Sequence, residues 1–145
     1  MSKSQVCADA SLLVKLILPE LGSDTAKTLW DEWEDDGISV LAPSLILYEF
    51  TSSVNKYVQR AWLTVERGCE ALDFLLRLPL ELISGDTIHR GALAIATELS
   101  LPSAYDAHYI AVARDLNCPL WTGDQRMHDA AARLAIDVNL VPAKP

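Results

Sequence analysis

Four acidic residues occupy places where a purely structural residue would more comfortably be apolar or small: Asp9, Glu49, Asp106 and Asp124. Asp9 closes the first apolar run of the chain, and Asp124 follows the last clear strand-like run. Glu49 and Asp106 lie inside or at the start of helical patterns. Carboxylates from distant segments repel one another in a partly dry crevice unless a cation neutralises them. If the four converge, we therefore expect a site for a hard divalent metal.

The elements that must position these residues are short apolar strands alternating with helices. Strand-like runs cover residues 5–8, 38–42, 80–83, 119–122 and 138–141. Helical patterns cover residues 11–18, 23–35, 44–61, 64–78, 87–99, 103–117 and 125–134. This alternation predicts an α/β fold with a parallel sheet covered on both faces. Because ligands of such sheets bind at the carboxyl ends of the strands, we expect Asp9 and Asp124 at that edge.

Paired helical patterns interrupt the simple alternation. Two of them stand between the second and third strands, and two more between the third and fourth. We expect such a pair to form an antiparallel arm that stands away from the sheet. Apolar residues on this arm could form a dimer surface or could simply face the sheet: Trp62, Leu72, Leu75 and Leu76.

Three of the acidic residues have a plain structural alternative. Asp9 and Asp124 precede helical patterns and are typical N-cap residues, which accept a hydrogen bond from a backbone N–H. Asp106 stands three residues after Ser103, which resembles a capping box. Glu49 fits no capping role, because it lies on the apolar stripe of its helix; the alternative is a solvated residue at the edge of that stripe. The combination therefore indicates a site more than any single residue does.

Hydroxyl and basic residues surround the acidic positions. Ser11 stands two residues after Asp9, and Thr122 stands two before Asp124. Their hydroxyls suit a supporting shell that orients carboxylates, although turns commonly contain the same residues. Four basic residues are candidates to contact an RNA backbone or are solvated surface charges: Lys15, Lys56, Arg60 and Arg126. Arg126 is the best of these, because it begins a helix two residues beyond Asp124.

The composition is typical of one globular domain, which we expect to span residues 1–145. Half of the residues are hydrophobic, but no run reaches the roughly 18 apolar residues of a membrane helix. The net charge of −8 argues against non-specific nucleic-acid binding and suits a basic partner segment, such as an inhibitory peptide. Cys7, Cys69 and Cys118 show no CxxC spacing, so we expect buried thiols in a reducing, cytoplasmic compartment.

Several short motifs together resemble one known family. They are Asp9-Ala10-Ser11, Tyr48-Glu49, the segment from Ser103 to Tyr109, and Thr122-Gly123-Asp124. In order and spacing they resemble the PIN-domain family, and more narrowly its VapC-like toxin ribonucleases from toxin–antitoxin pairs. The resemblance covers nearly the whole chain.

The resemblance implies a three-layer α/β/α sandwich with a parallel sheet ordered 3-2-1-4-5. It also implies a Mg²⁺- or Mn²⁺-dependent endoribonuclease that acts on RNA, forms a homodimer and is held inactive by a cognate antitoxin. The family's metal-binding and catalytic roles carry over to Asp9, Glu49, Asp106 and Asp124. A supporting hydroxyl role carries over to Thr122 and Ser11.

Two other interpretations remain open. A receiver-like domain would need an acidic pair at the end of the first strand and an acceptor after the third. Asp86 stands at the second of these positions, but Asp9 has no acidic neighbour. A module that binds a partner without catalysis would also suit an acidic α/β chain. Phosphate-binding glycine loops of the GxxxxGK[ST] or GxGxxG type are absent from the sequence.

Overall fold

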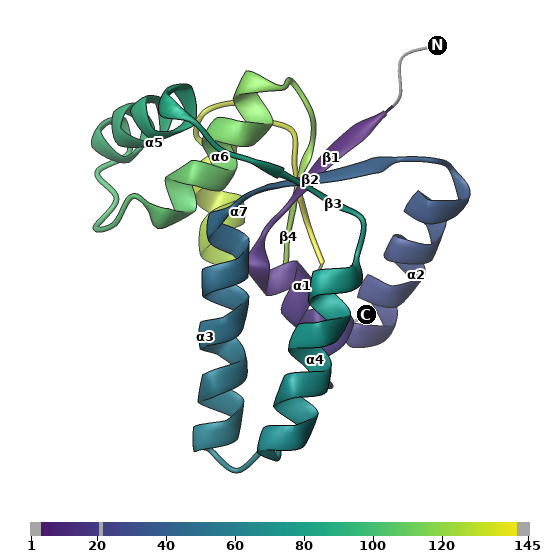
Figure 1. Cartoon of the computed structure of the whole chain (residues 1–145). Helices are drawn as coiled ribbons and strands as arrows, with labels where there is room; N and C mark the ends of the chain where they lie inside the picture. Colours follow the sequence, from purple (N-terminus) through teal and green to yellow (C-terminus); the bar gives the residue numbers. More distant parts are fainter. Residues whose placement is uncertain (1–3, 21, 142–145) are drawn as a thin grey trace.

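The computed structural model describes residues 4–20 and 22–141, and its centre is a five-stranded sheet (Figure 1). The strands lie in the order β3-β2-β1-β4-β5, and every neighbouring pair is parallel. They comprise β1 Gln5–Ala8, β2 Ser39–Pro43, β3 Leu80–Ile83, β4 Leu120–Thr122 and β5 Val138–Leu140. The expected sandwich with this strand order is confirmed. The two ends of the expected domain, residues 1–3 and 142–145, lie outside the described residues.

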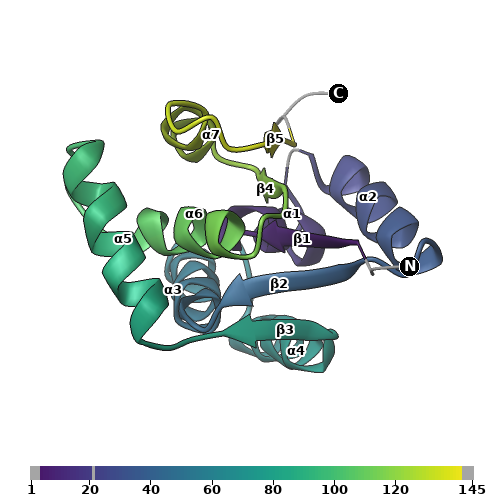
Figure 2. The same cartoon turned by 90° about the horizontal axis from the view of Figure 1, so that it is seen from above.

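The position of β1 creates a crevice at one edge of the sheet. β1 lies between β2 and β4, so the direction of strand progression reverses there (Figure 2). Such a reversal separates the loops that leave the two neighbouring strands, and ligands of α/β sheets bind in that gap. A receiver-like sheet has the different order 2-1-3-4-5, so that alternative is wrong. Asp86 follows the edge strand β3, two strands away from β1.

Helices cover both faces of the sheet. They comprise α1 Ala10–Ile17, α2 Ser23–Asp35, α3 Leu45–Gln59, α4 Val65–Arg77, α5 Asp86–Glu98, α6 Tyr105–Asp115 and α7 Gln125–Ala132. On one face α6 contacts β1, β2 and β4, and α5 packs against α6. On the opposite face lie α1, α2 and the α3–α4 pair (Figure 1). None of the helices described is long and apolar enough to cross a membrane.

The expected arm is formed by α3 and α4, which run antiparallel and project from the sheet (Figure 1). The two helices approach closely at Gly68, where a Cβ atom would lie 3.0 Å from a side-chain atom of α3. The apolar residues of the arm divide between the two expected roles. Leu75 is buried and Leu72 is half-buried, whereas Trp62 and Leu76 are exposed by 60% and 59%. Part of the arm therefore packs inward and part presents apolar surface.

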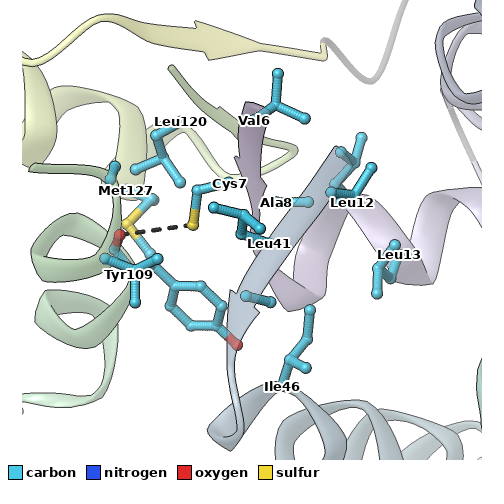
Figure 3. Packing of buried hydrophobic residues seen from close by; sticks show 14 of the residues in the cluster. Val6, Cys7, Ala8, Leu12, Leu13, Leu41, Ile46, Tyr109, Leu120 and Met127 are labelled. Carbon is cyan, nitrogen blue, oxygen red and sulfur yellow. Dashed lines mark hydrogen bonds between the residues drawn. The ribbon is translucent and has the colours of Figure 1, made fainter. Parts of the chain in front are cut away.

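The core lies between the central strands and the helices on either side. Figure 3 shows its largest contributors around β1, which include Leu41, Ile46, Tyr109, Leu120 and Met127. The thiol of Cys7 donates a hydrogen bond to the carbonyl of Tyr109, with 3.7 Å between sulfur and oxygen. Cys7 and Cys118 are buried as expected. The expectation was wrong for Cys69, which is exposed because it lies off the inward stripe of α4.

Candidate active site at the carboxyl edge of the sheet

Asp9 stands directly after β1, and its carboxylate is almost fully buried, with 3% of the residue exposed. It is the N-cap of α1, because its Oδ1 accepts a hydrogen bond of 3.0 Å from the backbone N–H of Leu12. The same oxygen accepts a bond of 2.6 Å from the Ser11 hydroxyl. Oδ2 accepts a bond from the Thr122 hydroxyl. The capping interpretation is therefore correct, and the carboxylate has further partners besides.

The hydroxyls of Ser11 and Thr122 connect the ends of β1 and β4. Their oxygens lie 3.2 Å apart, although they are 111 residues apart in the chain. Ser11 Oγ also accepts a hydrogen bond of 2.8 Å from the N–H of Gly123. Thr122 Oγ1 accepts one of 3.0 Å from the N–H of Asp124. These two side chains thus hold the turn after β4 against the turn after β1 and orient the buried carboxylate of Asp9.

Asp124 is the N-cap of α7, as its structural interpretation proposed. Its Oδ1 accepts a hydrogen bond of 2.9 Å from the N–H of Arg126. Its Oδ2 lies 3.5 Å from the Arg126 guanidinium, whose side chain is 88% exposed. Arg126 is therefore at the site, where it partly offsets the charge of Asp124 and remains accessible from solvent.

Glu49 extends from α3 toward α6. It is half-buried, and its Oε1 accepts a hydrogen bond of 2.5 Å from the Tyr109 hydroxyl. Figure 3 shows the Tyr109 ring reaching from α6 toward the start of α3, near Ile46. Burial and the neighbouring charge of Glu49 raise the pKa of the Tyr109 phenol, so this hydroxyl acts as a donor. The hydrogen bond to Glu49 was not predicted, and its only signal in the sequence is the position of Tyr109 three residues after Asp106.

Asp106 is the second residue of α6 and is half-buried. The capping-box alternative is wrong for this residue. The N-cap of α6 is Ala104, which makes no side-chain capping bond, and Ser103 Oγ instead accepts from the N–H of Tyr105. Asp106 is therefore placed at the edge of the sheet without a capping duty.

Electrostatic repulsion links the four carboxylates in one continuous series. Burial, with a further contribution from the charge of Asp124, raises the pKa of Asp9 to about 6 despite its hydrogen bonds. Burial and the charge of Asp124 also raise the pKa of Asp106. Burial and, to a smaller extent, the charge of Asp106 raise the pKa of Glu49. The structure thus brings together at one edge all four residues that the sequence singled out.

The donor set suits a hard divalent cation. Carboxylate oxygens are preferred ligands of Mg²⁺. Burial and, to a smaller extent, mutual repulsion raise the pKa of Asp9, Glu49 and Asp106, so a bound cation would stabilise their charged forms. Among residues 4–20 and 22–141, no three histidine, cysteine or acidic side chains are arranged to hold one metal ion as they stand. Mg²⁺ keeps several of its own water ligands, so a few of these carboxylates would suffice to bind it.

A pocket of about 660 Å³ opens beside Glu49. Glu49 forms part of its wall, together with Ala10, Ser11, Leu45, Tyr48, Ser52, Ser53, Lys56 and Tyr105. Two of the lining residues, Tyr48 and Tyr105, are exposed by 75% and 62%. This volume lies within the roughly 300–1,000 Å³ of small-ligand sites. Part of an extended substrate can therefore enter next to the acidic edge, by which we mean the carboxyl ends of the strands with Asp9, Glu49, Asp106 and Asp124. The two exposed tyrosines were not predicted as part of the site.

Comparison with known proteins agrees with this architecture. The PIN domain family matches residues 6–133 of the chain. The chain therefore belongs to the PIN domain family. No curated protein matches the sequence.

Solved structures of toxin–antitoxin proteins share the fold. VapBC2 from Rickettsia felis, bound to a DNA fragment from its promoter, is 17% identical, with a TM-score of 0.70 over 94% of this chain and 98% of that one. VapC20 from Mycobacterium tuberculosis, a toxin that cleaves the sarcin–ricin loop, is 18% identical, with a TM-score of 0.65 over 86% and 94%. FitAcB from Neisseria gonorrhoeae is 14% identical, with a TM-score of 0.63 over 94% and 97%. The chain thus has the fold of VapC toxins.

Proposed function

We propose that this protein is a Mg²⁺- or Mn²⁺-dependent endoribonuclease and the toxin of a toxin–antitoxin pair. The observation that carries the proposal is geometric: hydrogen bonds of Ser11 and Thr122 join the turns that hold Asp9 and Asp124. Asp106 and Glu49 lie near enough for neighbouring carboxylates to add to their raised pKa values. Membership of the PIN domain family and the shared fold with VapC toxins support it. We also infer that residues 1–145 form one domain and that the protein is cytoplasmic.

In this proposal Asp9, Glu49, Asp106 and Asp124 supply the oxygens that hold metal. A divalent metal at such a site stabilises charge on a phosphoryl group and lowers the pKa of a bound water. Ser11 and Thr122 orient Asp9 by donating hydrogen bonds to both of its oxygens. Tyr109 does the same for Glu49. These donors restrict the rotamers of the two carboxylates, so little reorganisation is needed when substrate binds.

A cleavage assay tests the proposal directly. Single-stranded RNA should be cut by the purified protein with Mg²⁺ or Mn²⁺ and should remain intact when a chelator is added. The variant Asp106→Asn should be inactive while it keeps its circular dichroism spectrum. Asp86→Asn is the matched control, because Asp86 begins α5 next to the edge strand and should leave cleavage unchanged. Metal-independent cleavage, or full activity of Asp106→Asn, would contradict the proposal.

The alternative of a partner-binding module without catalysis is decided by the same assay. If the wild-type protein cuts no RNA with either metal but binds an antitoxin-like peptide, the binding function alone would stand. We propose a cognate antitoxin as partner because structural relatives were solved as complexes, VapBC-1 from Haemophilus influenzae among them. A basic inhibitory segment would complement the net charge of −8 and the acidic edge.

We also propose a homodimer, because the molecule presents exposed apolar side chains on its helical arm. Val65 and Leu76 are exposed by 62% and 59%. Light scattering after size-exclusion chromatography should give twice the mass of 15.9 kDa. A monomer at every concentration would exclude this part of the proposal and leave the nuclease untouched.

A further inference from the structure

A second, smaller pocket adjoins the acidic site on the side of α3. It has a volume of about 250 Å³ and is lined by Ser11, Val14, Lys15, Glu20, Ser53, Lys56, Tyr57, Arg60 and Gly123. Ser11, Ser53 and Lys56 line both this pocket and the larger one beside Glu49. The two pockets are therefore neighbours, and a chain-like ligand at the acidic edge can extend from one into the other.

Part of the lining of this pocket is a polar network in which Lys15, Glu20 and Tyr57 interact with one another. Lys15 is buried, with 7% of the residue exposed, and its ammonium lies 3.4 Å from Glu20 Oε1. Glu20 Oε2 also accepts a hydrogen bond from the Tyr57 hydroxyl. The stem of Lys15 passes so close to Gly123 that a Cβ atom there would lie 2.5 Å from Lys15 Cε. Lys15 thus forms a buried ion pair with Glu20 and is not a solvated surface charge.

Lys56 and Arg60 are the exposed cations of the pocket wall. They stand one turn apart in the last turn and at the C-cap of α3, and like charges at this spacing repel one another on a helix surface. In the described part of the chain, no carboxylate forms an ion pair with either of them. In a chain with eight more acidic than basic residues, two such cations side by side indicate a place for an anion.

Aromatic side chains lie next to these cations. The Arg60 guanidinium stands 5.0 Å from the centre of the Trp62 ring, and the Tyr57 ring meets Trp62 edge-on at 5.3 Å. Trp62 is exposed by 60%. Cations interleaved with exposed aromatic rings are typical of surfaces that bind single-stranded nucleic acid, where phosphates pair with the cations and bases stack on the rings.

We propose that this second pocket is a subsite for the RNA backbone, in which Lys56 and Arg60 bind phosphates next to the bond that is cut. Trp62 offers a surface on which a neighbouring base stacks. The inference rests on the proposed nuclease function and adds the place where this acidic protein holds its substrate. It also explains how a chain of net charge −8 binds RNA, since the favourable charge is concentrated beside the acidic edge.

Steady-state cleavage of a single-stranded oligoribonucleotide tests the subsite. The double variant Lys56→Gln, Arg60→Gln should raise KM about tenfold, which corresponds to about 1.4 kcal/mol, and the effect should fall mainly on KM rather than on kcat. When Lys56→Gln is combined with Arg60→Lys instead of Arg60→Gln, KM should rise less, because lysine keeps the charge. Arg114→Gln is the matched control: Arg114 lies in the last turn of α6, beside the loop that precedes β4. An unchanged KM in the double variant would overturn the subsite.

Binding without turnover separates this proposal from the nuclease itself. With chelator present, the affinity for a fluorescent single-stranded RNA should fall with salt, and the double variant should reduce that slope by about 1.4 for two lost phosphate contacts. Trp62→Leu should weaken binding about tenfold with the slope unchanged. If the protein cuts no RNA but its affinity for RNA still depends on salt and on these side chains as described, the nuclease proposal is wrong and the subsite proposal is supported. If an acidic peptide, and not RNA, depends on Lys56 and Arg60, the pocket belongs to a protein partner and the subsite is overturned.

Discussion

The two halves of the candidate site are built in different ways. Asp9 and Asp124 follow strands, and each caps the helix that comes next. Glu49 and Asp106 lie on helices and cap nothing. Asp9 is held by hydroxyls from its own edge of the sheet, whereas Glu49 is held by Tyr109 from a helix on the other face. In the proposed site, the carboxylates at the strand ends would therefore serve both the fold and the metal, while those on the helices would serve the metal alone.

The largest expected effect is the loss of activity when a helix-borne carboxylate is neutralised. Glu49→Gln and Asp106→Asn should each lower RNA cleavage by at least about a hundredfold, since even supporting residues of metal sites commonly cost 10–100-fold. Neither change removes a cap or a buried hydrogen bond, because glutamine can still accept from Tyr109. The melting temperature should therefore change by no more than about 3 °C. Marked unfolding of either variant would show that the helix-borne half also supports the fold.

A second large effect concerns the stability of the metal-free protein in Asp9→Asn. The folded pKa of Asp9, about 6, exceeds the ordinary value for aspartate, so the folded state binds its proton more tightly than the unfolded state does. The free energy of unfolding therefore falls as pH rises from about 4 to 6, and the penalty, up to about 3 kcal/mol, persists above pH 6.

Asparagine carries no charge, so Asp9→Asn should remove this penalty. Thermal melts with chelator should show the variant more stable than the wild type at pH 7.5 and nearly equal to it at pH 4. Added Mg²⁺ should raise the melting temperature of the wild type more than that of the variant. Asparagine keeps one acceptor oxygen for the cap but loses the second, so a variant that is less stable at both pH values would show that the hydrogen bond from Thr122 to the second oxygen outweighs the charge penalty.

A smaller effect distinguishes the capping duty of Asp124 from its charge. Asp124→Ala removes the acceptor for the N–H of Arg126 and should destabilise the protein by about 1 kcal/mol. Asp124→Asn keeps an acceptor and should be close to the wild type in stability. Both variants should be inactive, because both lose the carboxylate. Urea unfolding gives the difference, and equal stability of the two variants would mean that the cap contributes nothing.

The strand-borne half was easier to predict from the sequence than its helix-borne counterpart. Short apolar runs predicted β1 and β3 to the residue, with Pro79 marking the start of β3, and parallel strands then placed Asp9 and Asp124 at one edge. Glu49 was noticed only because a charge stood on an apolar stripe. No local pattern predicts that Tyr109 donates to Glu49, because the two are 60 residues apart and meet only through packing. The burial of Lys15 and the exposure of Cys69 depend on tertiary contacts in the same way.

The smallest expected effect concerns Tyr109→Phe, which removes the donor that holds Glu49. The hydrogen bond from Tyr109 lowers the pKa of Glu49, opposing the larger effect of burial. Without it, that pKa should rise further, so the acid limb of the pH profile of kcat/KM should move to higher pH. Activity at the alkaline plateau should fall only modestly, because the carboxylate itself remains. Tyr105→Phe is the matched control, since its exposed side chain lines the pocket without a bond to Glu49. An acid limb that stays in place in Tyr109→Phe would mean that this hydroxyl does not favour the ionised form of Glu49, and the two halves of the site would then differ in capping but not in the support that hydroxyl donors give to their carboxylates.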